Sequence, residues 1–447
     1  MSDYAEFIRQ KSQAGHDGGF EPVFMPDFLF DFQKSLVEWA LRKGRSAIFA
    51  DCGLGKTPMQ LVWAENVFKK TGKPVLILTP LAVAPQTVRE GAKFGIECRQ
   101  SRDGNSEGRI IVANYEKLHL FNAEDFSAVV CDESGILKNS HGATRNAVVD
   151  FMRGIKYRLL CSATPSPNDY TELGNSVAAL GLMRNVEMLA KYFIHDSADT
   201  GNWRLKGHAT EMFWKFVASW ARAIRHPRDI GFEQDGYDLP PLRSHLSMLP
   251  SAPMDGFLFP TEAVTLDEQR YERRATIQAR CEQTAAIANR DGDQFVAWCS
   301  LNSESELLTN LINGAVELSG SDSDEEKESK VMDFAQGRIR ALVTKPKICS
   351  HGVNWQSCHR MSFFPSHSHE QFYQSIRRCW RFGQKNPVDV HIVTTEAESL
   401  VLENLRRKER DSDAMFSRVV HHMRTYYEQL PEKYQPKQQI QIPPWLK

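Results

Sequence analysis

The sequence has 447 residues, of which 41% are hydrophobic and 25% are charged, and its formal net charge is -1. These fractions are typical of folded globular domains, the length predicts two or three of them, and the near-neutral charge excludes a protein that is basic over its whole surface. No apolar run reaches the roughly 20 residues that a membrane span needs, and the N-terminal residues lack the pattern of a signal peptide. We therefore expect a cytoplasmic protein with no membrane partner.

Nine cysteines are scattered along the chain. Several lie inside apolar, strand-like segments, as Cys131 and Cys161 do, which is typical of free buried thiols in a reducing compartment. A zinc site would lack the paired Cys-x-x-Cys knuckle that such sites commonly use, so we expect no zinc. The residues that raise the question are Cys349, His351, Cys358, His359, His367 and His369.

The segment 50–57 has the pattern of a phosphate-binding loop. It follows a strand-like apolar run at 46–49 and precedes a helical pattern that starts at Pro58. A strand, a glycine-rich turn, Gly-Lys-Thr and a helix let backbone N–H groups surround a phosphate at a helix N-terminus. The predicted phosphate-binding residues are Gly53, Gly55, Lys56 and Thr57.

Two carboxylates directly follow the apolar run 128–131. ATP hydrolysis needs one acid to hold Mg²⁺ and a second to orient and deprotonate the attacking water. We assign Asp132 to the metal, together with the Thr57 hydroxyl, and Glu133 to the water. Lys56 would contact the β- and γ-phosphates. A plain turn at a strand end is the alternative for the acid pair.

Buried strands alternate with helical patterns in both halves of the chain. This alternation predicts parallel sheets with helices on both faces, which bind ligands at the carboxyl ends of the strands. We therefore expect an α/β protein with two tandem parallel-sheet lobes. The predicted strands are 46–49, 73–80, 109–115, 128–131 and 157–165 in the first lobe, and 293–300, 315–320 and 340–345 in the second.

Helical patterns and proline-rich stretches divide the chain further. The helix at 29–40 carries Gln33 on its polar side, where the amide can pair with an adenine edge. A solvated surface glutamine is the alternative. The predicted parts are a lead-in (1–28), a first lobe (29–240) with a helix-rich insertion at about 170–235, a linker (241–265), a second lobe (266–395) that opens with a long helix at about 267–289, and a C-terminal helix and tail (396–447).

A basic motif lies near the end of the second lobe. Arg378 and Arg381 are three residues apart in a predicted helix, and we expect them on one helical face. Two guanidinium groups there can hold a phosphate in the transition state, an effect worth about 10³–10⁵ in rate in other phosphoryl-transfer enzymes. The alternatives are a solvated surface helix and a patch that binds a phosphate backbone.

The order of these motifs resembles that of the superfamily-two helicases. It runs through Gln33, the Gly-Lys-Thr loop, the acid pair and Ser162-Ala163-Thr164. The finer resemblance, over about residues 28–395, is to Swi/Snf-type (sucrose non-fermenting) DNA translocases, in a compact prokaryotic or phage form. The segments that resemble the family's second, third, fifth and sixth motifs are 132–139, 164–168, 349–355 and 374–384. The departure is Gly135, where the family usually has His.

The resemblance implies two RecA-like lobes that bind ATP and Mg²⁺ between them and DNA across the opposite groove. It adds Gly352 and Gln374 to the nucleotide contacts. Contacts with nucleic acid would go to phosphates and carry no sequence preference. Structural capping is the alternative for Thr79 and Thr344. The nucleic-acid contacts that it implies are Thr79, Asn114, Tyr115, Ser162, Thr164, Ser300, Thr344 and Asn354.

We therefore expect an ATP-driven motor that moves along double-stranded DNA. It would act as a monomer in the bacterial cytoplasm, or in the cytoplasm or nucleoid of the host if a phage encodes it. A strand-separating DNA or RNA helicase is a second hypothesis within the same chemistry. A nucleotide-gated scaffold that hydrolyses ATP poorly is a third, and Gly135 motivates it.

Overall fold

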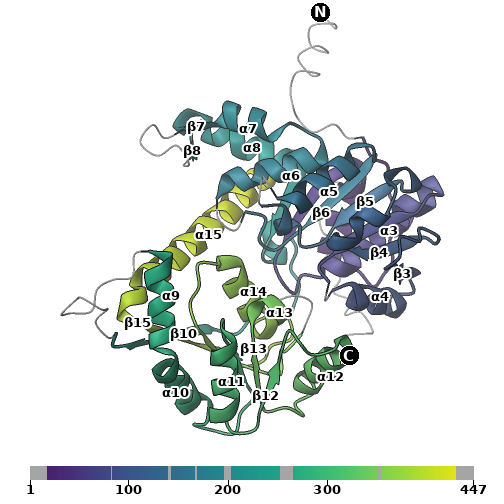
Figure 1. The fold of residues 1–447 in the computed structure, drawn as a ribbon. Helices are drawn as coiled ribbons and strands as arrows, with labels where there is room; N and C mark the ends of the chain where they lie inside the picture. The colour runs from purple at the N-terminus through teal and green to yellow at the C-terminus, as the bar shows by residue number, and fades with distance from the viewer. Residues whose placement is uncertain are drawn as a thin grey trace, which may run out of the picture. The chain divides into compact units, whose positions relative to one another are not determined.

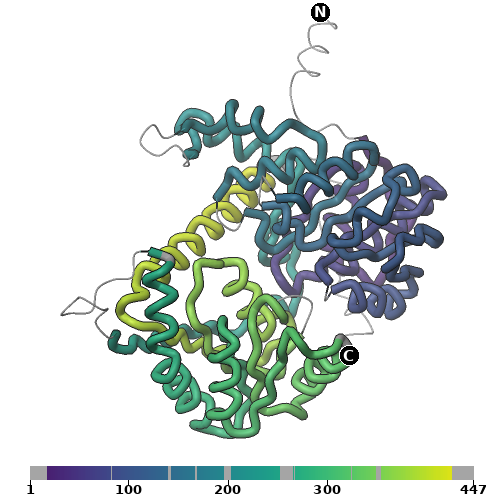
Figure 2. Tube along the Cα trace, viewed as in Figure 1, coloured from purple at the N-terminus to yellow at the C-terminus, as the bar shows by residue number. Residues whose placement is uncertain are grey.

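The structure is a computed structural model that describes residues 18–81, 83–138, 142–166, 169–195, 203–251, 265–349 and 354–428. The chain divides into two compact units, each with its own large sheet. Unit 1 comprises Met1–Asp235 and Asp411–Lys447, and unit 2 comprises Gly236–Arg410. Figure 1 labels their helices and strands, and Figure 2 follows the chain by residue number. The predicted class of two parallel-sheet α/β lobes is confirmed.

Unit 1 is built on a seven-stranded sheet in the order β3-β4-β2-β5-β6-β1-β9. Every neighbouring pair is parallel, so the carboxyl ends of all strands lie at one edge. The central strands are apolar and buried along almost their whole length, as in sheets that helices cover on both faces. The strands are β1 (Arg45–Ala50), β2 (Val75–Thr79), β3 (Cys98–Gln100), β4 (Ile110–Asn114), β5 (Ala128–Cys131), β6 (Tyr157–Cys161) and β9 (Ala221–Ile224).

Helices cover the faces of this sheet. The helix that follows the glycine-rich turn, α3, starts at Lys56, two residues earlier than the sequence predicted, and it packs on β2, β4, β5 and β6. The helices of unit 1 are α2 (Asp31–Lys43), α3 (Lys56–Thr71), α4 (Ala84–Lys93), α5 (Ala143–Arg153), α6 (Leu173–Leu180), α7 (Asn185–Tyr192) and α8 (Thr210–Trp220).

The insertion predicted at 170–235 is helical only in part. It holds α6, α7 and α8, and a short antiparallel hairpin of β7 (Phe193–His195) and β8 (Trp203–Leu205) follows α7. The chain then returns to the main sheet, where β9 pairs in parallel with β1. The sequence did not indicate β9, because four residues, three of them apolar, directly after an apolar helix show neither a period nor a breaker.

Unit 2 is built on a six-stranded parallel sheet in the order β10-β15-β14-β11-β13-β12. Two apolar clusters fill it, one around Trp298, Trp355 and Phe363, and one around Phe295 and Val343. The strands are β10 (Leu242–Leu249), β11 (Phe295–Trp298), β12 (Ala315–Leu318), β13 (Ala341–Thr344), β14 (Arg360–Phe363) and β15 (Val388–Thr395).

The predicted linker at 241–265 was wrong in its first part. Leu242–Leu249 is the edge strand β10, paired residue by residue with β15, and the chain enters unit 2 at Gly236. The prolines that suggested a linker flank this strand and do not interrupt it, which an edge strand tolerates. Most of its side chains are exposed, so it lacks the apolar run of a central strand.

The long helix predicted at about 267–289 is two helices that meet at Thr276. The Thr276 hydroxyl donates to the Glu272 carbonyl at 2.7 Å, and such hydroxyls compete with the helical backbone. The helices of unit 2 are α9 (Leu266–Ala275), α10 (Ile277–Ala288), α11 (Asn302–Leu311), α12 (Asp324–Ala335), α13 (Pro346–Cys349), α14 (His369–Cys379) and the start of α15 (Ser399–Glu428).

Helix α15 contributes to both units, because the boundary falls at Arg410–Asp411 within it. Leu402 and Leu405 are buried in unit 2, whereas the Met423 sulfur accepts a hydrogen bond from the Ala223 N–H of unit 1 at 3.1 Å. The sequence predicted this helix but assigned it to a separate C-terminal part. In the part of the chain that the structure describes, no helix combines the length and apolarity that a membrane crossing requires.

Candidate active site

The phosphate-binding loop links the carboxyl end of β1 to the first residue of α3. Gly53 and Gly55 have positive φ angles of 91° and 78°, which favour glycine, and Gly55 caps α3 in the left-handed region. The Lys56 side chain folds back over the loop, and its Nζ donates to the Ala50 carbonyl at 3.1 Å. The four residues predicted to bind phosphate therefore lie together at a helix N-terminus, the arrangement that binds anions.

Gln33 packs directly against this loop. Its Nε2 donates to the Leu54 carbonyl at 3.0 Å, and its Oε1 accepts from the Phe30 N–H at 3.0 Å. A Cβ atom at Gly55 would lie 2.2 Å from the Gln33 Nε2, so only glycine fits there. Both ends of the Gln33 amide thus support the loop in this structure. Its contact with adenine stays a prediction.

The two predicted carboxylates lie beside the loop, at the carboxyl end of β5. The Lys56 Nζ is 3.9 Å from Glu133 Oε1. Asp132 Oδ1 accepts a hydrogen bond of 2.6 Å from Gln60 Nε2, and the backbone carbonyl of Asp132 accepts one of 2.7 Å from the Tyr115 hydroxyl. The phosphate loop and the acid pair, far apart in sequence, therefore form one site in unit 1.

Burial and mutual repulsion set the charge states of this site. Burial, followed by the neighbouring Glu133 carboxylate, raises the pKa of Asp132, and the Gln60 hydrogen bond acts in the opposite direction. Burial alone would lower the pKa of Lys56, but Glu133, Asp132 and Asp51 outweigh it and the pKa is raised. Lys56 therefore stays an ammonium group, as a phosphate ligand must.

The residues at this corner fit Mg²⁺. Three largely buried carboxylates, those of Asp51, Asp132 and Glu133, surround the single ammonium group of Lys56, so negative charge exceeds positive charge. Mg²⁺ is bound through one or two protein oxygens together with phosphates and water. The Asp132 carboxylate and the Thr57 hydroxyl would supply such oxygens. Among the described residues, no three His, Cys, Asp or Glu side chains are grouped to hold a metal by themselves.

The absence of zinc stays a prediction. Of the residues that raised the question, His351 lies outside the described residues. Cys358 and His369 are both buried, and the Cys358 thiol donates to the Arg360 carbonyl at 3.2 Å.

Six of the eight residues predicted to contact nucleic acid are buried in this structure. Only Ser300 and Asn354 are exposed. The Thr344 hydroxyl donates to the Leu318 carbonyl at 3.0 Å, as the capping alternative predicted. Contacts with a phosphate backbone would require the buried residues to become accessible, so the assignment stays a prediction. The six buried residues are Thr79, Asn114, Tyr115, Ser162, Thr164 and Thr344.

Two residues of the site have roles that the sequence did not indicate. Tyr115 was expected at a nucleic-acid surface, but its hydroxyl bonds to the acid corner. Gln60 was not singled out at all. The available signal was its position four residues after Lys56, which places both on one face of α3.

The arginine motif of unit 2 has a different geometry from the one predicted. Helix α14 ends at Cys379, and Trp380 has a non-helical ψ of 83°. The expectation that Arg378 and Arg381 share one helical face is therefore wrong, because Arg381 lies beyond the helix. At the end of α14, the Trp380 indole donates to the Pro240 carbonyl at 2.7 Å.

Gln374 and Arg378 bind each other. The Arg378 Nη2 donates to Gln374 Oε1 at 2.7 Å, its Nε donates to the Gln374 carbonyl at 2.9 Å, and both side chains are buried. Arg381 is only partly buried. Gln374 thus positions an arginine in this structure, and its contact with nucleotide stays a prediction. Gly352, the other predicted contact of unit 2, lies outside the described residues.

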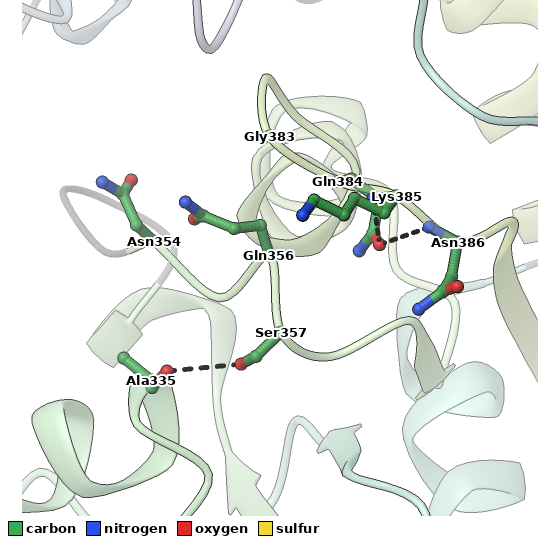
Figure 3. A pocket seen from close by; sticks show the side chains of 8 residues that line it. All are labelled: Ala335, Asn354, Gln356, Ser357, Gly383, Gln384, Lys385 and Asn386. Atoms are coloured by element: carbon green, nitrogen blue, oxygen red, sulfur yellow. Dashed lines mark hydrogen bonds between the residues drawn. The ribbon is translucent and has the colours of Figure 1, made fainter. Parts of the chain in front are cut away.

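A polar pocket of about 430 Å³ borders this motif (Figure 3). The Gln384 side chain makes four hydrogen bonds beside this pocket. Its Oε1 accepts from the Lys385 and Asn386 N–H groups at 2.9 Å, and its Nε2 donates to the Cys358 and Cys379 carbonyls. Gln384 therefore stabilises the loop that follows α14. The pocket is lined by Ala335, Asn354, Gln356, Ser357, Gly383, Gln384, Lys385 and Asn386.

No protein-family model matches the chain. The chain is similar to the SWI/SNF-related matrix-associated actin-dependent regulator of chromatin subfamily A-like protein 1 of Xenopus laevis, at 28% identity over 164 residues, which cover 34% of this chain and 17% of that protein. It is also similar to the DNA annealing helicase and endonuclease ZRANB3 of Mus musculus, at 26% identity over 180 residues, which cover 35% of this chain and 17% of that protein. The resemblance to Swi/Snf-type proteins is confirmed.

The matched segment spans 17% of the length of these Swi/Snf-type relatives. Among solved structures, the chain aligns with the Sulfolobus solfataricus SWI2/SNF2 ATPase core in complex with dsDNA at a TM-score of 0.43 and 16% identity. That alignment covers 91% of this chain and 98% of the other.

Proposed function

We propose that the protein is an ATP-dependent nucleic-acid motor, most specifically a translocase on double-stranded DNA. The observation that carries the proposal is the grouping of Lys56, Asp132 and Glu133 at the end of one parallel sheet, with the Lys56 ammonium 3.9 Å from the Glu133 carboxylate. A buried lysine, a metal-binding acid and a second acid for the water are the parts that ATP hydrolysis requires.

Each group of the site has a distinct role in this proposal. The loop N–H groups and Lys56 hold the phosphates, and Lys56 exchanges its present bond to the Ala50 carbonyl for phosphate oxygens. Glu133 accepts a proton from the attacking water. Asp132 and Thr57 would hold Mg²⁺, which supplies charge neutralisation at the β- and γ-phosphates. Arg381, partly exposed after α14, would stabilise the transition state when the two units close on the nucleotide.

Similarity to Swi/Snf-type relatives supports DNA as the partner, since the name of the mouse relative includes DNA annealing helicase. The proposed cycle couples hydrolysis to closure and opening of the two units. ATP would bind the closed state more tightly than ADP does, so hydrolysis would favour opening. We further propose a monomer in a prokaryotic or phage-infected cytoplasm. Light scattering of the purified chain tests the monomer.

The decisive experiment is ATP turnover with and without duplex DNA, over a series of salt concentrations. Stimulation by DNA that falls as salt rises is expected, since contacts with phosphates release counterions. A Lys56→Ala chain serves as the control for contaminating ATPase. Turnover that DNA does not change at any salt concentration would contradict a DNA-dependent motor.

Two further candidate functions are separated by simple assays. Displacement of a triplex strand from unbroken duplex supports translocation, whereas unwinding of a fork supports the strand-separating helicase. A nucleotide-gated scaffold is favoured by Gly135, which lacks the side chain that Swi/Snf-type motors usually have at this place. That reading predicts tight nucleotide binding with turnover close to that of the Lys56→Ala control.

A further inference from the structure

Two buried side chains from different elements bind to Asp132. The Tyr115 hydroxyl donates to its backbone carbonyl at 2.7 Å, and Gln60 Nε2 donates to its carboxylate at 2.6 Å. Tyr115 is 4% exposed and Gln60 is fully buried, so water cannot replace either bond. One residue thus holds the main chain of the acid, and the other holds its side chain.

The bond from Tyr115 crosses a neighbouring strand. Tyr115 follows β4, Asp132 follows β5, and β2 lies between these strands in the sheet. Neighbouring strands are about 4.8 Å apart, so the Tyr115 side chain and its 2.7 Å hydrogen bond together bridge about twice that distance. A tyrosine is long and rigid enough to do this, since it has only two rotatable side-chain bonds. The ends of β4 and β5 are thereby tied together over Thr79, the last residue of β2.

The carbonyl that Tyr115 holds belongs to the peptide unit between Asp132 and Glu133. The orientation of this unit determines the φ angle of Glu133, which is 48°. Among the described residues, Glu133 is the only one other than glycine with a positive φ. Side chains other than glycine are disfavoured there, and such strain persists only where the surroundings impose it. The hydrogen bond from Tyr115 is a restraint of that kind.

Gln60 ties the acid to the phosphate loop. It lies one turn after Lys56 on α3, and its bond to Oδ1 fixes one oxygen of the Asp132 carboxylate. This hydrogen bond therefore couples the position of the Asp132 carboxylate to that of α3.

We propose that Tyr115 and Gln60 are positioning residues for phosphoryl transfer at this site. Tyr115 sets the backbone from which the Glu133 carboxylate reaches the water, and Gln60 sets the rotamer of Asp132 toward Mg²⁺. This inference rests on the proposed function of the site. It also couples the end of β4 to the acid pair, because Tyr115 belongs to the first and bonds to the second. The exposed residues Glu116 and Lys117 lie next to Tyr115. This coupling does not need the His that Swi/Snf-type motors usually have in place of Gly135.

The test of Tyr115 is the Tyr115→Phe chain, which keeps the ring and removes only the donor. We expect kcat to fall about tenfold or more, with nucleotide affinity within about twofold, because small misplacements of catalytic groups act on the chemical step. Tyr157→Phe is the matched control. Tyr157 is also buried and in the same sheet, but its hydroxyl bonds to none of the described residues.

Gln60 is tested by direct binding, with no need for turnover. In the Gln60→Met chain the side chain keeps its length and loses its donor. We expect the gain in affinity for a fluorescent ATP analogue that Mg²⁺ produces to shrink about tenfold, while binding in EDTA stays within about twofold of wild type. Thermal unfolding of both chains should match that of wild type to within a few degrees.

The outcomes separate this inference from the proposed function. A wild-type chain that binds no nucleotide overturns both. A wild-type chain that hydrolyses ATP, with Tyr115→Phe equal to Tyr157→Phe and Gln60→Met unchanged in its Mg²⁺ response, overturns the inference alone. Equal losses of kcat and of metal-free nucleotide affinity would show a merely structural role and would also overturn it.

Discussion

One lysine and three acidic residues of unit 1 lie together in a small, largely buried space. The nearest charges to Lys56 belong to Glu133, Asp132 and Asp51, and they keep the lysine protonated despite its burial. In the proposed function, this group of residues would bind a phosphate and a divalent cation.

Replacing Gly55 should damage nucleotide binding beyond any effect on folding. An alanine there meets both a φ of 78° and the Gln33 amide at 2.2 Å. Gly72 has a similar φ of 70° but nothing within 4 Å of an added Cβ. We expect Gly55→Ala and Gly72→Ala each to lose about 1–2 kcal/mol of stability through the backbone. Only Gly55→Ala should also lose tenfold or more in nucleotide affinity, measured by titration of a fluorescent nucleotide.

Replacing Glu133 by Gln should separate binding from chemistry. The amide keeps the shape of the side chain but cannot take a proton from water, so we expect turnover to fall by about 10²–10⁴. Nucleotide affinity should change by no more than a few-fold. Steady-state ATPase assays and equilibrium binding on the same preparation measure the two quantities. Unchanged turnover would refute the role of Glu133 and favour the scaffold hypothesis.

The residues of the loop and the acid pair could be predicted from sequence, because each follows a buried strand and parallel strands bring their carboxyl ends to one edge. The bond from Tyr115 to the acid corner was not indicated, because a strand-end tyrosine looks alike in sequence whether it faces solvent or a neighbouring strand. The bond between Gln374 and Arg378 was not indicated for a similar reason. Sequence spacing placed it beside Arg378 but could not show that the two side chains bind each other.

Among helices and strands, the regular, apolar ones were predicted from the sequence, whereas the short or exposed ones were missed. The central strands were predicted because they are continuous and apolar, as strands buried on both faces must be. The edge strands β9 and β10 were missed, since short or exposed strands carry no such signal. The end of α14 before Arg381 coincides with a distant contact, that of Trp380 with Pro240, which no local pattern contains.

The pairing of β10 with β15 should weaken in acid. His391 stacks on His245 with ring centroids 4.8 Å apart, and His245 Nε2 is 2.7 Å from Asp389 Oδ1. Burial, then His245 and Arg360, lowers the pKa of His391 from 6.5 to about 4, while Asp389 acts in the opposite direction and Arg290 in the same direction. As pH falls from 6.5 to 4, the unfolded chain binds a proton that the native chain does not, so stability falls.

Urea unfolding followed at about pH 7.5 and about pH 5 tests this linkage. The midpoint of unit 2 should drop in acid for wild type and drop less for His391→Asn. The exposed His119 of unit 1 provides the control, since His119→Asn should leave the drop unchanged. Equal acid sensitivity of wild type and His391→Asn would contradict the prediction.

The whole molecule consists of two units that are joined by the linking segment at Asp235–Gly236 and by one continuous helix, α15. Unit 1 holds the phosphate loop and the acids, and unit 2 holds the arginines. We propose that ATP hydrolysis needs both units. Unit 1 alone can then bind nucleotide, but turnover requires a cation from unit 2.

Arg381 is the residue that tests this claim most directly, because it is partly exposed and substitution should not disturb a core as loss of the buried Arg378 would. ATP turnover and nucleotide affinity should be measured for Arg381→Ala beside Arg243→Ala, an exposed arginine of β10. We expect near-normal affinity for both chains and a loss of turnover of about 10³–10⁵ for Arg381→Ala alone. Wild-type turnover in the Arg381→Ala chain would contradict this expectation.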